Sequence, residues 1–258
     1  MKGIMIIGHG SRFNFNKWVM DKQKERLEDM GFENIYIGFN ETSIPLAGDT
    51  LALMVADGID EVIAVPFFVA SGLHITRDIP NKLGIPNNSD GGIVDVEGKQ
   101  VRIHYKSPFG NDPLLSTILF ERVTELRGKG RRAGILVVGH GSRLPYNKET
   151  ITFQSNRLKE MGLENVRYAF NEFDEPHIED VMSELSLLDV DEIIVLPLFI
   201  SMGAHLKNDI PGKIGLEDKV WEGFYEHGGK SIPVKYALPI GEDPRLTEVI
   251  ANKIREHL

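Results

Sequence analysis

Residues 8–12 read Gly-His-Gly-Ser-Arg, and residues 139–143 read Gly-His-Gly-Ser-Arg again. The offset between the two copies is 131 positions (139 − 8). Three further landmarks keep the same offset: His74 with His205, Phe-Asn-Glu at 39–41 with 170–172, and Asp-Ile-Pro at 78–80 with 209–211. An unbroken register of this kind predicts a tandem duplication. We therefore expect two domains, 1–127 and 132–258, joined by the basic turn at 128–131.

Each half alternates apolar runs with helix-like segments. Residues 4–7 are continuously apolar, as expected of a strand buried on both faces. Further strands are predicted at 35–39, 62–68 and 101–105, and helices at 16–30, 46–57, after His74 and at 113–127. Strands that alternate with helices favour a parallel sheet flanked by helices, so the fold class is α/β in both halves.

Composition narrows the class of protein. The 258 residues are 41% hydrophobic and 26% charged, which is typical of a globular chain with a substantial core. A net charge of −9 argues against nucleic acid as a partner. No apolar run approaches the ~20 residues that span a bilayer, and the first run is too short for a signal peptide. Together with the absence of cysteine, these features predict a cytoplasmic protein without membrane contact.

The repeat sorts the eight histidines into two groups. His9 and His140 are equivalent, as are His74 and His205, whereas the other four face different residue types: His104, His177, His227 and His257. The matched histidines follow predicted strands, and open α/β sheets bind ligands at the carboxyl ends of their strands. Imidazole can bind a divalent metal or accept a proton. A single histidine beside glycines is often only a turn residue, but the repeated pairs favour a functional site.

Several polar residues near these histidines are further candidates. Glu41 and Glu172 follow the second predicted strand of each half, which places them at the edge of the sheet that carries the matched histidines. The alternative is that they are acidic loop residues exposed to solvent. Ser11 and Ser142 either cap the following helix or bind a ligand. Arg12 and Arg143 are suited to binding a carboxylate through paired hydrogen bonds.

The ordered motifs resemble those of the class II tetrapyrrole chelatases, in particular the sirohydrochlorin cobaltochelatase (CbiX) family in its long, two-repeat form. The resemblance covers almost the whole chain and rests on Val-Gly-His-Gly-Ser-Arg at 138–143, Pro-Phe-Phe-Val-Ala-Ser-Gly-Leu-His at 66–74, Arg-Asp-Ile-Pro at 77–80 and Pro-Ile-Gly-Glu-Asp at 239–243. It implies two chelatase-like domains. It also implies ATP-independent insertion of a divalent metal into sirohydrochlorin, Co²⁺ first and Ni²⁺ or Fe²⁺ as alternatives, in the biosynthesis of cobalamin or a related tetrapyrrole.

The resemblance also implies roles for the candidate residues. The metal-binding and proton-accepting side chains would be His9, His74, His140 and His205, with Glu41 and Glu172 as further proton acceptors. The carboxylates of sirohydrochlorin would be bound by Ser11, Arg12, Ser142 and Arg143. No cofactor is expected beyond the substrate metal. The chain is expected to be a monomer with internal pseudo-twofold symmetry, because its second half replaces the partner of the short, dimeric forms.

One departure distinguishes the halves. The second half reads Glu-Phe-Asp-Glu-Pro at 172–176, whereas the first reads Glu-Thr-Ser-Ile-Pro at 41–45. The extra acids, Asp174 and Glu175, favour the second half as the more active one. A non-catalytic carrier of tetrapyrrole or metal is the alternative function. A serine hydrolase is disfavoured, because neither Ser11 nor Ser142 lies in a Gly-x-Ser-x-Gly motif.

Overall fold

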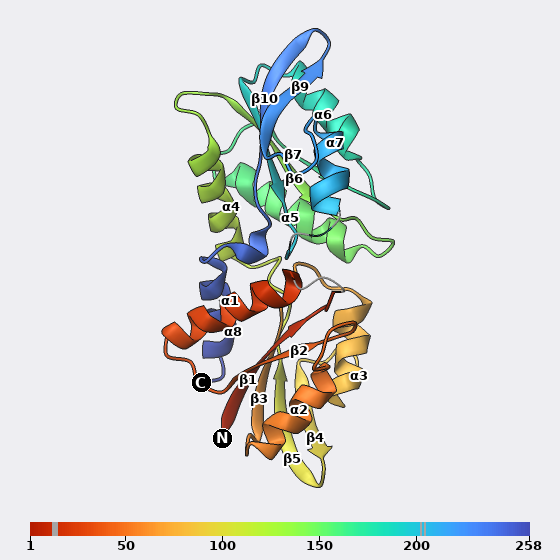
Figure 1. Ribbon diagram of the computed structural model, residues 1–258, viewed down its shortest axis with the longest axis vertical. Coiled ribbons are helices and arrows are strands. Elements are labelled where there is room, and N and C mark those ends of the chain that lie inside the picture. Colours follow the sequence, from red (N-terminus) through yellow and green to blue (C-terminus); the bar gives the residue numbers. More distant parts are fainter. Residues whose placement is uncertain (12–14, 202, 204) are drawn as a thin grey trace. The chain divides into compact units, whose positions relative to one another are not determined.

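The computed structural model describes residues 1–11, 15–201, 203 and 205–258, and for His205 it describes the backbone only. The chain forms two compact units (Figure 1). The first comprises Met1–Phe109 together with Glu242–Leu258, and the second comprises Gly110–Gly241. No helix within the described ranges is long and apolar enough to cross a membrane.

The first unit is built on a five-stranded sheet in the order β2-β1-β3-β5-β4. The strands are β1 (Lys2–Gly8), β2 (Ile35–Phe39), β3 (Glu61–Pro66), β4 (Gly91–Val96) and β5 (Lys99–Tyr105). They are connected through α1 (Phe15–Asp29), α2 (Ala47–Ala56), the π-helical turn η1 (His74–Asp78) and α3 (Ile79–Leu83). Strands β2, β1, β3 and β5 run parallel, as the alternating pattern predicts.

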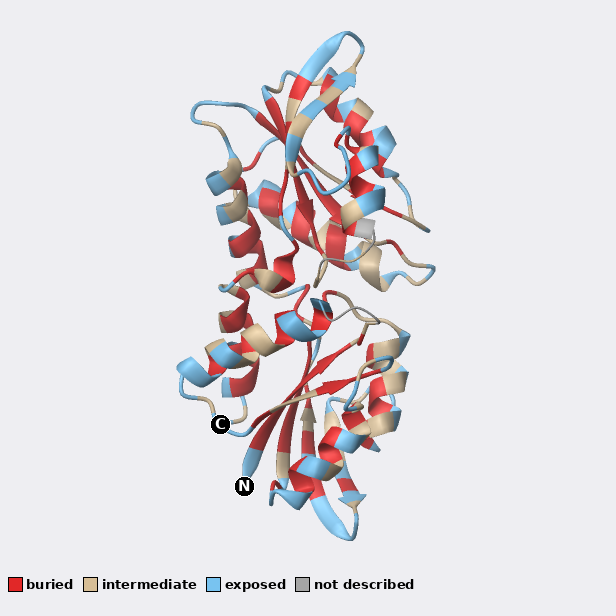
Figure 2. Cartoon of the chain, in the orientation of Figure 1, coloured by how far each residue is buried: buried red, intermediate tan, exposed pale blue. Residues whose placement is uncertain are grey.

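The second unit repeats this plan in the order β7-β6-β8-β10-β9. Its strands are β6 (Ala133–Gly139), β7 (Val166–Phe170), β8 (Glu192–Pro197), β9 (Glu222–His227) and β10 (Lys230–Tyr236). The intervening elements are α5 (Tyr146–Glu160), α6 (Ile178–Leu187), the π-helical turn η2 (His205–Asp209) and α7 (Ile210–Lys213), and the short 3₁₀ turn η3 (Ile240–Glu242) follows β10. The central strands β1 and β6 are almost wholly buried (Figure 2), which explains their continuous apolar sequence.

Both sheets carry an antiparallel edge strand that the sequence pattern did not predict. Strand β4 pairs with β5, and β9 pairs with β10, through two-residue hairpins. The hairpin residues Glu97 and Gly98 have φ values of 52° and 81°, and Gly228 and Gly229 have φ values of 56° and 78°. Positive φ at both turn positions matches the twist of the flanking strands. The sheets are therefore parallel except at this edge.

The compact units differ from the sequence repeats 1–127 and 132–258 in one respect. Helix α4 (Pro113–Leu126) ends the first repeat but belongs to the second unit, where it packs on α5 and β8. Helix α8 (Leu246–Arg255) ends the second repeat but belongs to the first unit, where it packs on α1 and β3 (Figure 1). Each unit thus takes its last helix from the other repeat.

Candidate functional site

The end of β1 brings His9 next to Glu41. Gly10, which follows His9, has a φ of 92°, and a Cβ atom there would lie 1.7 Å from the carbonyl oxygen of Glu41. Only glycine therefore allows the segment after β2 to pass this close. The backbone N–H of Glu41 donates to the carbonyl of His9 at 2.9 Å, which fixes the two residues side by side.

His74 completes a cluster of three ligand-bearing side chains. His9, Glu41 and His74, referred to below as the His9 cluster, offer ligand atoms that all lie within 4.8 Å of one another. His9 Nε2 is 3.5 Å from Glu41 Oε1, and the rings of His9 and His74 meet edge to face with centroids 4.7 Å apart. Two ligands bound to one cation at ~2.1 Å each lie roughly 3 Å apart, so small side-chain rotations would suffice to bind a metal ion.

The contacts of Nδ1 indicate which ring nitrogen of His9 and of His74 is available to a metal ion. The Nδ1 atom of His9 is 3.1 Å from the carbonyl oxygen of Gly10, and Nδ1 of His74 is 2.9 Å from Oδ2 of Asp78. The amide nitrogen of Asn40 also approaches His74 Nδ1, at 3.0 Å, but the carboxylate is the stronger acceptor. Both rings therefore donate from Nδ1, and both keep an Nε2 lone pair for a metal ion or a proton.

Asp78 is a site residue to which sequence reasoning gave no role. Arg77 Nε donates to Asp78 Oδ1 at 2.9 Å. The hydrogen bond from Arg77, followed by that from His74, lowers the pKa of the Asp78 carboxyl below its ordinary value, although partial burial opposes the shift. An ionised Asp78 fixes the tautomer and the ring orientation of His74. The available sequence signals were the repeat at Asp209 and the four-residue spacing from His74.

The second unit reproduces the backbone of this site. A Cβ atom on Gly141 would lie 1.6 Å from the carbonyl oxygen of Glu172, and Glu172 N–H donates to the carbonyl of His140 at 2.9 Å. His140 Nδ1 lies 3.2 Å from the carbonyl oxygen of Gly141, as His9 Nδ1 does from Gly10. The side chain of His205 lies outside the described residues, so the geometry of its predicted pair with His140 stays a prediction.

The serine and arginine candidates occupy the turn after each matched histidine. Ser11 N–H donates to Ser43 Oγ at 3.0 Å. Ser142 N–H donates to Asp174 Oδ2 at 2.9 Å, and the Ser142 hydroxyl accepts from the N–H of Leu144. Arg143 is exposed, whereas Arg12 lies outside the described residues.

Asp174 therefore has a structural role that the sequence did not reveal. It accepts the backbone bond in the second unit that Ser43 accepts in the first. At this position the two halves therefore differ in the side chain that accepts the backbone hydrogen bond. The expectation that the second half is the more active one stays a prediction.

The unmatched histidines His104 and His257 lie together in a different part of the first unit. Their rings stack with centroids 4.0 Å apart, and His104 Nε2 is 2.9 Å from Glu61 Oε1 at the amino end of β3. Desolvation, with Lys106 as the next contribution, lowers the pKa of His257. This pair is therefore separate from the His9 cluster at the carboxyl ends of the strands.

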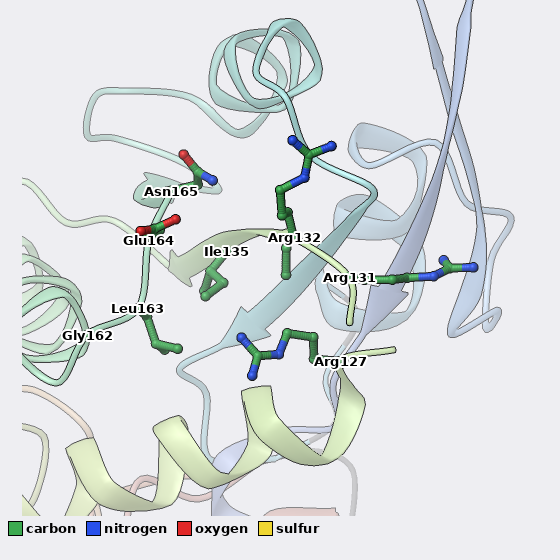
Figure 3. A pocket seen from close by; sticks show the side chains of 9 residues that line it. Arg127, Arg131, Arg132, Ile135, Gly162, Leu163, Glu164 and Asn165 are labelled. Atoms are coloured by element: carbon green, nitrogen blue, oxygen red, sulfur yellow. The ribbon is translucent and has the colours of Figure 1, made fainter. Parts of the chain in front are cut away.

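The cavity in Figure 3, of about 150 Å³, also lies away from the matched histidines. It sits beside the amino end of β6 in the second unit, and its lining includes Arg127, Arg131 and Arg132. The first unit has its counterpart of about 250 Å³ at the amino end of β1, lined in part by the equivalent residues Ile4, Gly31 and Asn34. Both hollows lie at the edge of the sheet opposite His9 and His140, so neither marks the candidate site.

Comparison with known sequences finds relatives of both repeats. The sequence model of the family described as CbiX matches residues 3–126 and again residues 134–257. A sirohydrochlorin cobaltochelatase of Methanopyrus kandleri is 35% identical over 138 residues, which cover 48% of this chain and 96% of the relative. A probable sirohydrochlorin cobaltochelatase of Halobacterium salinarum is 28% identical over 228 residues, covering 82% of this chain and 76% of the relative. The shorter relative thus corresponds to about one repeat.

Solved structures share the two-repeat fold. SirB from Bacillus subtilis with Fe³⁺ superposes with a TM-score of 0.75 at 20% identity, over 99% of this chain and 94% of that one. The sirohydrochlorin chelatase SirB from Bacillus subtilis subspecies spizizenii, in complex with cobalt, gives a TM-score of 0.71 at 19% identity and the same coverage. At these identities the likeness establishes the fold alone.

Proposed function

The chain belongs to the CbiX family, and we propose that it is a chelatase that inserts a divalent metal ion into sirohydrochlorin. The observation that carries this proposal is the His9 cluster, in which His9, Glu41 and His74 converge at the carboxyl ends of three parallel strands. The relatives named sirohydrochlorin cobaltochelatase support the same substrate. The equivalent candidates in the second repeat are His140, Glu172 and His205.

The cluster suits the capture of a hydrated divalent cation. Its two Nε2 atoms are borderline ligands, and Glu41 adds a charged oxygen ligand about half exposed to solvent. We propose Co²⁺ as the substrate metal because the relatives at 32–36% identity are named cobaltochelatases. Ni²⁺ and Fe²⁺ are the alternatives, since imidazole binds all three ions.

Insertion also requires a base. The dication replaces two pyrrole N–H protons, so two nitrogen–metal bonds form as two N–H bonds break, and both protons must leave the macrocycle. A neutral imidazole Nε2 can accept a proton once it has released the metal. The Glu41 carboxylate, 3.5 Å from His9 Nε2, can pass that proton toward solvent. His9, Glu41 and His74 thus bind the metal ion and also accept protons that the macrocycle releases.

The substrate carboxylates need donors at the same rim. We propose Ser11, Arg12, Ser142 and Arg143 for this role, since all four lie two or three positions after His9 or His140. The exposed guanidinium of Arg143 can form paired hydrogen bonds with a carboxylate. The reaction needs no nucleotide, because formation of the metal–nitrogen bonds supplies the driving force. The product would enter cobalamin or a related tetrapyrrole pathway.

An anaerobic assay without ATP tests the proposal. Sirohydrochlorin is mixed with the protein and Co²⁺, Ni²⁺ or Fe²⁺, and insertion is followed by the change in the absorption spectrum of the macrocycle. We expect catalytic turnover, fastest with Co²⁺. Binding of sirohydrochlorin without acceleration above the protein-free rate would instead identify a carrier.

A further inference from the structure

The turn beside each candidate site has an unusual backbone. In the second unit, Asp174 N–H donates to the carbonyl of Glu172 at 2.7 Å, and the residue between them, Phe173, has a φ of 62°. In the first unit, Ser43 N–H donates to the carbonyl of Glu41 at 2.6 Å, and Thr42 has a φ of 66°. Both are γ-turns with positive φ at the central residue, a rare and strained conformation. The backbone is thus the same in both repeats, whereas the side chains differ at the central residue and at the residue after it.

The side chain of Phe173 is large, apolar and exposed to solvent. It is 59% exposed, although burying a phenylalanine would contribute about 1.5–3 kcal/mol. A β-branched or bulky residue at positive φ is itself an outlier. Neither folding nor local conformation therefore favours phenylalanine here, and Thr42 shows that a small polar residue fits the same turn. Backbone strain of this kind clusters at active sites and ligand-binding segments, so the exposed ring on this turn is a candidate contact with a ligand.

The neighbours of Phe173 define what that ligand must be. Its ring lies nearly parallel to that of His140, at an interplanar angle of 18° and a centroid distance of 6.2 Å. The guanidinium carbon of Arg143 lies 5.6 Å from the centroid of the Phe173 ring. A proton-accepting or metal-binding atom, an aromatic ring and a cation are thus adjacent. This combination fits a flat aromatic polyanion.

The parallel rings also fix the orientation of such a ligand. A bond from an imidazole nitrogen to a metal or proton lies in the plane of the imidazole. A macrocycle that presents its face to His140 is therefore perpendicular to the His140 ring, and consequently perpendicular to the Phe173 ring. The contact between the macrocycle and Phe173 is edge to face, a preferred geometry for aromatic pairs.

We propose that Phe173 is a specificity-determining residue that contacts the face of the tetrapyrrole edge-on in the second repeat, while Arg143 binds one of its carboxylates. This inference rests on the proposed function and deepens it. The second repeat thereby holds the macrocycle through a contact that Thr42 does not provide in the first. Phe173 takes no part in metal capture.

A titration of metal-free sirohydrochlorin tests the inference without involving catalysis. We expect F173T to bind the macrocycle about fivefold more weakly than wild type, which is the usual contribution of one aromatic pair. F173Y should restore the affinity because it retains the ring, whereas F173L should not. The matched control is F224T, which removes an equally exposed phenylalanine (57%) from strand β9 of the same unit and should leave binding unchanged. Thermal unfolding of each variant verifies the fold.

These binding measurements distinguish a failure of the role of Phe173 from a failure of the proposed function. Wild-type protein that fails to bind sirohydrochlorin would overturn both. Tight binding by wild type together with equally tight binding by F173T or F173L would overturn the role of Phe173 alone. Unchanged Co²⁺ affinity in F173T is expected, and a parallel loss of Co²⁺ affinity would show that the substitution acts on the metal site instead.

Discussion

At the scale of single residues, Asp78 fixes the ring orientation in which His74 can bind a cation. The His74–Asp78 hydrogen bond of 2.9 Å joins residues at the two ends of η1, and Arg77 keeps the carboxyl ionised by lowering its pKa. A π-helical turn is a rare element that often occurs at functional sites. Here it brings a ligand and the residue that orients it onto one short segment.

Replacing Asp78 by alanine should weaken metal binding at the His9 cluster. The expected loss of Co²⁺ affinity is on the order of 10- to 100-fold, because His74 then loses the acceptor that fixes its tautomer. Calorimetric titration with Co²⁺ measures this loss, in an H140A background that disables the second repeat. D49A, which removes an exposed carboxylate at the start of α2, is the control. Equal affinity in D78A and D49A would contradict the role of Asp78.

The residues of the site were predictable to different degrees. The repeat and the predicted strand ends indicated His9, His74 and Glu41 as candidates, and the structure places these three side chains together. Asp78 and Phe173 could not be assigned in this way, since their roles depend on a π-helical turn and on a γ-turn. The contact of Asp174 was not predictable either, since its carboxylate accepts a hydrogen bond from the backbone N–H of Ser142.

At the scale of elements, the exchanged helices depend on buried polar contacts. In the second unit, Gln154 of α5 is fully buried, and its side chain donates to the carbonyl of Gly110 at 2.7 Å and accepts from the Ser116 hydroxyl at 2.7 Å. In the first unit, Gln23 of α1 makes the corresponding contacts with Asp243 and Thr247. Each glutamine thus binds the start of a helix that the other repeat supplies.

Replacing Gln154 by leucine should destabilise the second unit. The substitution keeps the volume but leaves the Gly110 carbonyl and the Ser116 hydroxyl buried without this partner, at a cost of about 1–3 kcal/mol each at most. Urea denaturation followed by circular dichroism should show a lower midpoint for Q154L. The control Q100L removes an exposed glutamine from β5. A Q154L midpoint equal to that of Q100L would count against the contact.

The sequence pattern predicted some elements of the fold and missed others. Apolar runs and an unbroken repeat predicted the parallel strands and the order of helices. The edge strands β4 and β9 were missed because their hairpins lie in stretches rich in polar and glycine residues. The helix exchange was also invisible, because α4 and α8 keep their repeat positions in sequence whichever unit they join.

At the scale of the whole molecule, each compact unit contains segments from both sequence repeats. The first unit includes Glu242–Leu258 of the second repeat, and the second unit includes the first repeat from Gly110 to the end of α4 at Leu126. Amphipathic helix α8 buries Leu246, Val249, Ile250 and Ile254 in the first unit. The duplication is therefore complete in sequence, whereas the units are complete only when both repeats are present.

Separate expression of the repeats tests this arrangement. Fragments 1–127 and 132–258 should each self-associate or unfold when alone, and should form a one-to-one complex when mixed, because each supplies the helix that the other unit needs. Analytical ultracentrifugation measures these states. The intact chain is the control, and we expect it to sediment as a 28.9 kDa monomer. A stable monomeric fragment 1–127 would argue against the exchange, and an intact chain found only at twice its mass would argue against the monomer.

We predict that the repeated histidines at the strand ends carry out metal insertion. The most direct measurement is the anaerobic rate of Co²⁺ insertion into sirohydrochlorin by H9A/H140A, compared with the control H177A/H227A, which removes two unmatched histidines. We expect a loss of about 100-fold or more in H9A/H140A, because metal capture and proton removal both lose their imidazole, and a nearly unchanged rate in the control. A folded H9A/H140A variant that inserts Co²⁺ as fast as H177A/H227A would contradict it.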